Sequence, residues 1–87
     1  MSNESTSLLD RLPPQDLEAE RSVLGSCLLQ NDVIDYLLTL VRANYFYSDS
    51  HQKMFAAMLS MHEQGIRGID AVTLSHELQK RGELEQI

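Results

Sequence analysis

Three histidines and one cysteine are the side chains of this sequence best suited to metal binding or nucleophilic chemistry. A zinc site on a helix favours two histidines one turn apart, and His51, His62 and His76 do not offer that spacing. His51 and His62 fall instead on an apolar helical line, which indicates core or capping roles. Cys27 has no sequence neighbour that would stabilise a thiolate, so we interpret it as a small buried hydrophobe. The sequence therefore predicts neither a metal site nor a catalytic nucleophile.

The acidic pair Glu18 and Glu20 is the remaining candidate for general acid/base chemistry. Both residues follow Asp16, which is placed to cap a helix after two prolines that favour extended backbone. Negative charge in a first helical turn is favourable beside the positive end of the helix dipole. We therefore attribute both glutamates to the helix start and predict no catalytic residue.

Signals for nucleotide and nucleic-acid binding are weak. No glycine-rich run ends in Gly-Lys-Ser/Thr, so the sequence predicts no P-loop and no bound cofactor. Residues 73–82 resemble the first helix of a helix-turn-helix unit, but the formal net charge of −6 opposes DNA binding. The aromatic run of residues 45–47 could stack on bases, yet only Arg42 is a nearby cation. We expect these aromatics to fill the core at a helix junction, and a DNA binder remains an alternative that the charge disfavours.

The composition limits the chain to one small domain. Its 87 residues, of which 43% are hydrophobic, support a marginal core that favours help from a partner, a second copy or a neighbouring segment. The single cysteine excludes an internal disulfide and suits a reducing compartment. The N-terminus lacks the features of a signal peptide, and no apolar run approaches the ~20 residues of a membrane span. We therefore expect a cytoplasmic protein without membrane contact.

Periodicity and cap signals predict an all-α fold, a small orthogonal bundle of about four main helices with a flexible N-terminal tail. The last helix should begin at its cap Asp70, face Leu74 and Leu78 inward and end at Gly82. The expected segments are a tail at 1–12, a helical domain at 13–87, and helices at about 17–29, 33–41, 49–64 and 71–81.

The apolar residues also predict how the helices pack. The third helix should be central, because its apolar arc is wider than a surface helix needs. Met54, Met58 and Met61 line one edge of this arc, where they either fill the core or form an adaptable partner surface. Gly25 costs roughly 1 kcal/mol inside a helix, so we expect another helix to approach closely there. The second helix, at 33–41, is strongly apolar and should be substantially buried.

Both ends of the chain suggest contacts beyond a simple bundle. Leu8, Leu9 and Leu12 form an apolar patch in an otherwise polar tail, which is interpreted as a frayed end or as a docking element. The last residues, 83–87, close on apolar side chains without a polar segment. We expect the chain to be an N-terminal piece of a longer protein.

Short blocks follow one another in a fixed order from Pro13 to Leu84. The blocks are Pro13-Pro14, Glu18-Ala19-Glu20, Val23-Leu24-Gly25, Phe46-Tyr47 with His51 and Phe55, and Ile69-Asp70 with Thr73-Leu74, Leu78, Gly82 and Leu84. Together they resemble the N-terminal domain of replicative DNA helicases of the bacterial and phage DnaB type.

This resemblance implies an all-helical domain that does not hydrolyse ATP. In the family it precedes a linker and a RecA-like motor domain, which binds ATP, Mg²⁺ and DNA. The resemblance further implies self-association in a hexameric ring and contacts with primase and a helicase loader. The helicase-binding domain of primases has a similar fold and is a close alternative, although the Glu18-Ala19-Glu20 opening favours the helicase. A freestanding adaptor that binds a partner helix in a Met-lined groove is a further alternative.

Overall fold

The computed structural model describes residues 16–86, and the fold within this range is all-α, without a strand. Its elements are α2 (Leu17–Leu29), α3 (Asp32–Leu38), the 3₁₀ turn η1 (Ala43–Tyr45), α4 (Asp49–Glu63), α5 (Ala71–Lys80) and the 3₁₀ turn η2 (Leu84–Gln86). The predicted all-α fold with four main helices is confirmed. The tail predicted at residues 1–12 lies outside the described residues.

The helices begin where short polar side chains satisfy free backbone amides. Asp16 Oδ1 accepts a hydrogen bond from the Ala19 amide at 3.0 Å, as predicted for the start of α2. Asp70 accepts from the Thr73 amide at 2.9 Å, and Thr73 Oγ1 accepts from the Asp70 amide at 2.9 Å, which completes a capping box. The hydrogen bonds from the backbone and hydroxyl of Thr73 lower the pKa of the Asp70 carboxyl. The carboxylate is thus the favoured form at this helix start.

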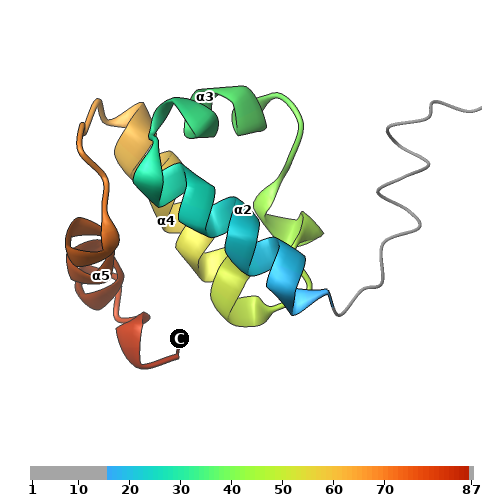
Figure 1. The fold of residues 1–87 in the computed structure, drawn as a ribbon. Coiled ribbons are helices and arrows are strands. Elements are labelled where there is room, and N and C mark those ends of the chain that lie inside the picture. The colour runs from blue at the N-terminus through green and yellow to red at the C-terminus, as the bar shows by residue number, and fades with distance from the viewer. Residues whose placement is uncertain (1–15, 87) are drawn as a thin grey trace, which may run out of the picture.

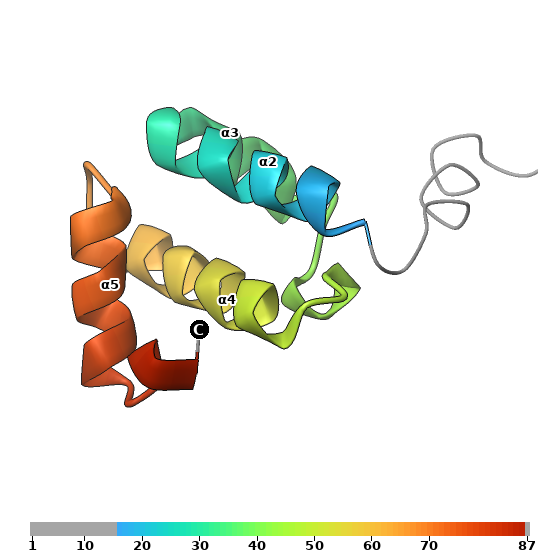
Figure 2. The same cartoon turned by 60° about the horizontal axis from the view of Figure 1, so that its bottom comes forward.

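Helix α4 is the centre of the bundle, as its wide apolar arc predicts. It contacts α2, α3, η1 and α5. Figures 1 and 2 show α2 running beside α4, while α5 crosses near the far end of α4 at a steep angle. The crossing of α5 gives the bundle its orthogonal character.

The core is a single cluster around α4. Phe55, Ala57 and Met58 are fully buried, and Leu74 and Leu78 of α5 face inward as predicted. Met61 is also buried and Met54 is partly buried against the cluster, so the interpretation that the methionines fill the core is confirmed and the alternative of an exposed methionine surface is wrong. The buried members are Leu24, Cys27, Ile34, Phe46, Phe55, Ala57, Met58, Met61, Ile69, Leu74 and Leu78.

Helix α3 is shorter and more exposed than its apolar sequence predicts. It spans seven residues, and Ile34 is its buried residue. Tyr36 and Leu38 are exposed. The reason is geometric. Because α3 lies at the edge of the bundle (Figure 1), only one face of this short helix packs against the core. The expectation of substantial burial is therefore wrong for the end of this helix.

Gly25 is a second point on which the structure differs from the prediction. A Cβ atom built at Gly25 would meet no heavy atom within 4 Å, so no described helix approaches closely there. We expect Gly25→Ala to stabilise the domain by up to about 1 kcal/mol, because alanine is the better helix former and the space is open. Urea unfolding followed by circular dichroism measures the change.

Gly65→Ala is the matched control for this measurement. The space around Gly65 is also open, but its φ is +80°, a backbone conformation that alanine adopts only with strain. This variant should be destabilised. A loss of stability in Gly25→Ala as well would contradict the open geometry around α2.

Candidate functional site

A partly buried carboxylate, that of Glu20, joins the first turn of α2 to the start of α4. Glu20 Oε1 lies 2.8 Å from His51 Nδ1 and accepts from the Ser48 amide at 3.3 Å, and Oε2 accepts from the Tyr47 amide. The side chains of Glu20 and His51 are only 14% and 13% exposed. Glu20 is thereby joined to three residues that lie 27, 28 and 31 positions later in the chain.

The hydrogen bonds of Glu20 decide its ionisation. Burial by itself raises the pKa of this carboxyl. The bonds from the His51 ring and from the amides of Tyr47 and Ser48, together with the charge of His51, outweigh burial and lower the pKa below its usual range. Glu20 therefore remains a carboxylate that bridges two helices, and its role exceeds the dipole interaction that the sequence predicts.

The neighbouring aromatics divide between core and surface. The ring of Phe46 is buried, with its centroid 5.2 Å from that of Phe55 and 6.4 Å from that of His51 in an edge-on arrangement. Tyr45 and Tyr47 are 57% and 54% exposed. The prediction that these aromatics fill the core is thus confirmed for Phe46 and wrong for the two tyrosines.

The second histidine of α4 makes a similar bridge nearer its end. His62 Nε2 lies 2.7 Å from Asp35 Oδ1 and so joins α4 to α3. Both α4 histidines therefore contact carboxylates of preceding helices, which corrects the prediction of core or capping roles. His76 is exposed on α5.

Asn31 has a role that the sequence analysis missed. Asn31 stands at the N-cap position of α3, but its side chain makes no cap hydrogen bond. Its Nδ2 donates to the carbonyls of Cys27 at 2.9 Å and Ile69 at 3.0 Å, and its Oδ1 accepts from the Ile69 amide at 2.7 Å. The end of α2 is thereby joined to the segment that enters α5. Only the turn composition around Asn31 marks it in the sequence, and this gives no hint of its partner.

The other predicted residues have local roles. Glu18 is exposed, and its Oε2 lies 3.5 Å from Nη1 of Arg21. Leu24 is in the core, and Gly82 has a φ of +74°, which suits a helix end. Cys27 is buried, and burial raises the pKa of its thiol, which disfavours a reactive thiolate. Within residues 16–86, no group of three or more His, Cys, Asp or Glu side chains is arranged to hold a metal ion.

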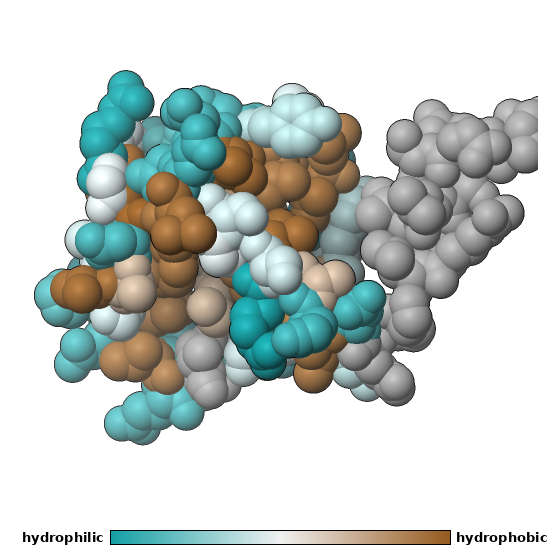
Figure 3. Space-filling view, in the orientation of Figure 1, coloured by the Kyte–Doolittle hydropathy of each residue, from teal (hydrophilic) through white to brown (hydrophobic). Residues whose placement is uncertain are grey.

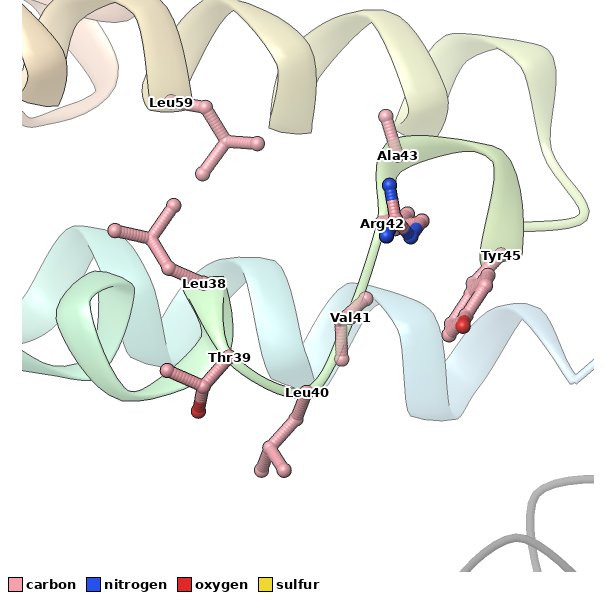
Figure 4. A pocket seen from close by; sticks show the side chains of 8 residues that line it. All are labelled: Leu38, Thr39, Leu40, Val41, Arg42, Ala43, Tyr45 and Leu59. Carbon is pink, nitrogen blue, oxygen red and sulfur yellow. The ribbon is translucent and has the colours of Figure 1, made fainter.

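A groove lies between the end of α3, the segment leading into η1, and α4. Its volume is about 450 Å³. In Figure 4 the side chains of Leu38 and Leu59 point toward one another across it, and Figure 3 shows hydrophobic surface around α3 and the segment that follows. Leu40 and Tyr45 are 49% and 57% exposed at its edge. The lining residues are Leu38, Thr39, Leu40, Val41, Arg42, Ala43, Tyr45 and Leu59. Exposed apolar and aromatic side chains of this kind are typical of protein contact surfaces.

The fold and these contacts define a small all-α domain in which His51 and His62 of α4 bond to carboxylates of the preceding helices. The chain belongs to the family of the DnaB-like helicase N-terminal domain, because the model of that family matches residues 12–87. Within the described part of the chain, no helix has the length and apolarity needed to cross a bilayer.

Relatives and a solved structure agree with this assignment. The chain is 46% identical over 77 residues to the replicative DNA helicase DnaB of Mycobacterium leprae, which covers 88% of this chain and 13% of that protein. It is 41% identical over 83 residues to the replicative DNA helicase DnaC of Bacillus subtilis, and this alignment covers 94% of this chain and 18% of that protein. The crystal structure of the N-terminal domain of DnaB helicase from Mycobacterium tuberculosis superposes with a TM-score of 0.79 at 45% identity, covering 87% of this chain and 52% of that one. The chain thus spans less than a fifth of these two helicases.

Proposed function

We propose that this chain is a non-catalytic assembly and docking module of a replicative DNA helicase. The whole protein would be a cytoplasmic, ATP-dependent helicase whose motor domain binds ATP, Mg²⁺ and DNA. The module would help to arrange six subunits into a ring and to dock primase and a helicase loader. The match of residues 12–87 to the DnaB-like helicase N-terminal domain carries this proposal.

Two features of the described residues support a structural rather than a chemical role. The carboxylate of Glu20 accepts its hydrogen bonds from residues at the start of α4, and Cys27 is enclosed in the core. The exposed side chains of Leu40 and Tyr45 offer anchors of the kind that protein interfaces use. The relatives are helicases, which favours the helicase over the alternatives of a primase fragment or a freestanding adaptor.

A chimeric helicase tests the proposal. In the Mycobacterium leprae protein, the aligned segment is replaced by residues 12–87 of this chain, and a second variant lacks the segment altogether. We expect the chimera to form hexamers by light scattering and to bind primase, and the deletion variant to lose one or both properties. A folded chimera that hydrolyses ATP but neither forms a ring nor binds primase would contradict the docking role.

The isolated chain provides the complementary measurement. It should hydrolyse no ATP above a mock preparation in the presence of Mg²⁺. Turnover that is abolished by a substitution within residues 17–84 would overturn the non-catalytic assignment.

A further inference from the structure

The segment that carries α5 and η2 is joined to the rest of the bundle by a largely exposed connection. Residues 64–70 link α4 to α5, and in this range Ile69 is buried and Ile66 is partly buried. Gly65 and Gly68 have φ values of +80° and +67°, so the chain changes direction at two points that favour glycine. Beyond them, α5 packs across the end of α4, whereas α2 runs along the length of α4 (Figure 2).

The core is divided unequally between the two sides of this connection. Of the eleven buried hydrophobic residues, Ile69, Leu74 and Leu78 follow the connecting glycines, and the other eight precede them. Those eight come from α2, α3, α4 and Phe46, which are packed around one another. If α5 separated from α4, the larger part of the core would therefore remain in place.

The polar contacts that hold α2 and α3 to α4 lie on the same side as the larger part of the core. Glu20 of α2 bonds to His51 and to two backbone amides at the start of α4. Asp35 of α3 lies 2.7 Å from Nε2 of His62 near the end of α4. Both contacts precede the connection to α5, so neither has to break when α5 leaves.

Asn31 joins the two sides. Its Nδ2 donates to the Ile69 carbonyl at 3.0 Å, and its Oδ1 accepts from the Ile69 amide at 2.7 Å, so one side chain binds both polar backbone groups of one residue. Asn31 directly precedes α3, and Ile69 directly precedes the cap of α5. These two hydrogen bonds hold the entrance of α5 against the rest of the bundle. By contrast, Glu77 pairs with Arg81 within the α5 segment itself.

We propose that residues 69–86 form a separately opening unit, in which α5 and η2 leave α4 while α2, α3 and α4 stay folded. The two hydrogen bonds between Asn31 and Ile69 keep the unit closed. Because a helix of ten residues is marginal in water, α5 unfolds when it leaves α4. Opening bares the face of α4 that α5 covers, so this face becomes accessible without global unfolding of the domain.

Native-state hydrogen exchange of the full chain tests the proposal, at a pH where the exchange rate reports the opening equilibrium. We expect the amides of residues 74–80 in α5 to exchange faster than those of residues 55–61 in α4. Their exchange should also depend less on low concentrations of urea, because opening of the unit exposes less surface than global unfolding. Equal rates of opening and equal urea dependence in the two groups would indicate a single cooperative domain and overturn the proposal.

Two matched cap variants distinguish the unit from the rest of the bundle. Asp70 caps α5 and Asp16 caps α2, each by accepting from the amide three residues ahead, at 2.9 and 3.0 Å. Asp70→Ala should accelerate exchange of residues 74–80 about fivefold. Asp16→Ala should accelerate residues 55–61 by about the same factor and leave residues 74–80 unchanged, because the α2 cap stays intact when α5 opens. Acceleration of residues 74–80 by both variants alike would contradict a separate unit.

Asn31→Asp tests the hydrogen bonds that keep the unit closed. This variant retains an oxygen for the Ile69 amide but loses the bond donated to the Ile69 carbonyl. We expect exchange of residues 74–80 to become about tenfold faster. Asn44→Ala, at an exposed position of η1, is the control and should leave these amides unchanged. Unchanged exchange of residues 74–80 in Asn31→Asp would contradict the role given to Asn31.

Discussion

Asn31→Ala should lower the free energy of unfolding by about 2–3 kcal/mol, a large share of the stability of so small a domain. The substitution removes two donated hydrogen bonds and one accepted bond at once. It leaves the amide and carbonyl of Ile69 without their side-chain partner, and Ile69 is only 1% exposed. Unpaired backbone groups next to a core residue cost more than the bond itself contributes. Urea unfolding followed by circular dichroism measures this loss.

Two further variants test whether the loss comes from the hydrogen bonds of Asn31 to Cys27 and Ile69 or from the removal of any asparagine. Asn31→Asp keeps an oxygen that accepts from the Ile69 amide but loses both donated bonds, so its stability should lie between those of Asn31→Ala and the natural chain. Asn44→Ala changes an exposed asparagine of η1 and should have little effect. If Asn31→Ala and Asn44→Ala were equally stable, the bridge would not hold α2 to the α5 entrance in solution.

The helix boundaries could be predicted because their causes are local. Asp16 and Asp70 each bond to an amide three residues ahead, and Gly82 takes the positive φ at the end of a helix. Such signals depend on neighbours within one turn, so they are visible in a single sequence. The predicted start of α2 and that of α5 are accordingly confirmed.

The bridges between helices could not be predicted for the opposite reason. Asn31 and Ile69 are 38 positions apart, and Glu20 and His51 are 31 apart. Periodicity reports which face of a helix is apolar, but it does not say which polar residues of two helices will meet. The partners of Glu20 and Asn31 depend on the order in which the elements surround α4.

The distinction between core and surface has the same limitation. Met58 and Tyr45 are both large residues beside apolar neighbours, yet Met58 is fully buried and Tyr45 is 57% exposed. Met58 belongs to the central helix, which has neighbours on several sides, whereas Tyr45 belongs to a short turn at the edge. The groove at residues 38–45 is therefore a product of the arrangement of the helices, and its exposed apolar side chains could not be distinguished from core residues beforehand.

Glu20→Ala is the second variant with a large expected effect, about 2–3 kcal/mol of lost stability at neutral pH. The carboxylate accepts hydrogen bonds from two amides and from the His51 ring, and bonds to a charged group contribute more than neutral ones. Its removal leaves the amides of Tyr47 and Ser48 without an acceptor at the start of α4. Glu18→Ala, which removes an exposed carboxylate from the same turn, is the matched control and should change stability little.

The effect of Glu20→Ala should also depend on pH in a definite direction. The folded-state pKa of Glu20 is lowered from 4.5, so its contribution is fully present above that pH. As the pH falls through the lower, folded-state pKa, the native carboxylate takes up a proton and the contribution is lost. The difference in melting temperature between the natural chain and Glu20→Ala should therefore be constant near neutrality and narrow below pH 4.5. A difference that stays the same down to pH 3 would show that Glu20 acts through packing, and that its negative charge is not what joins α2 to α4.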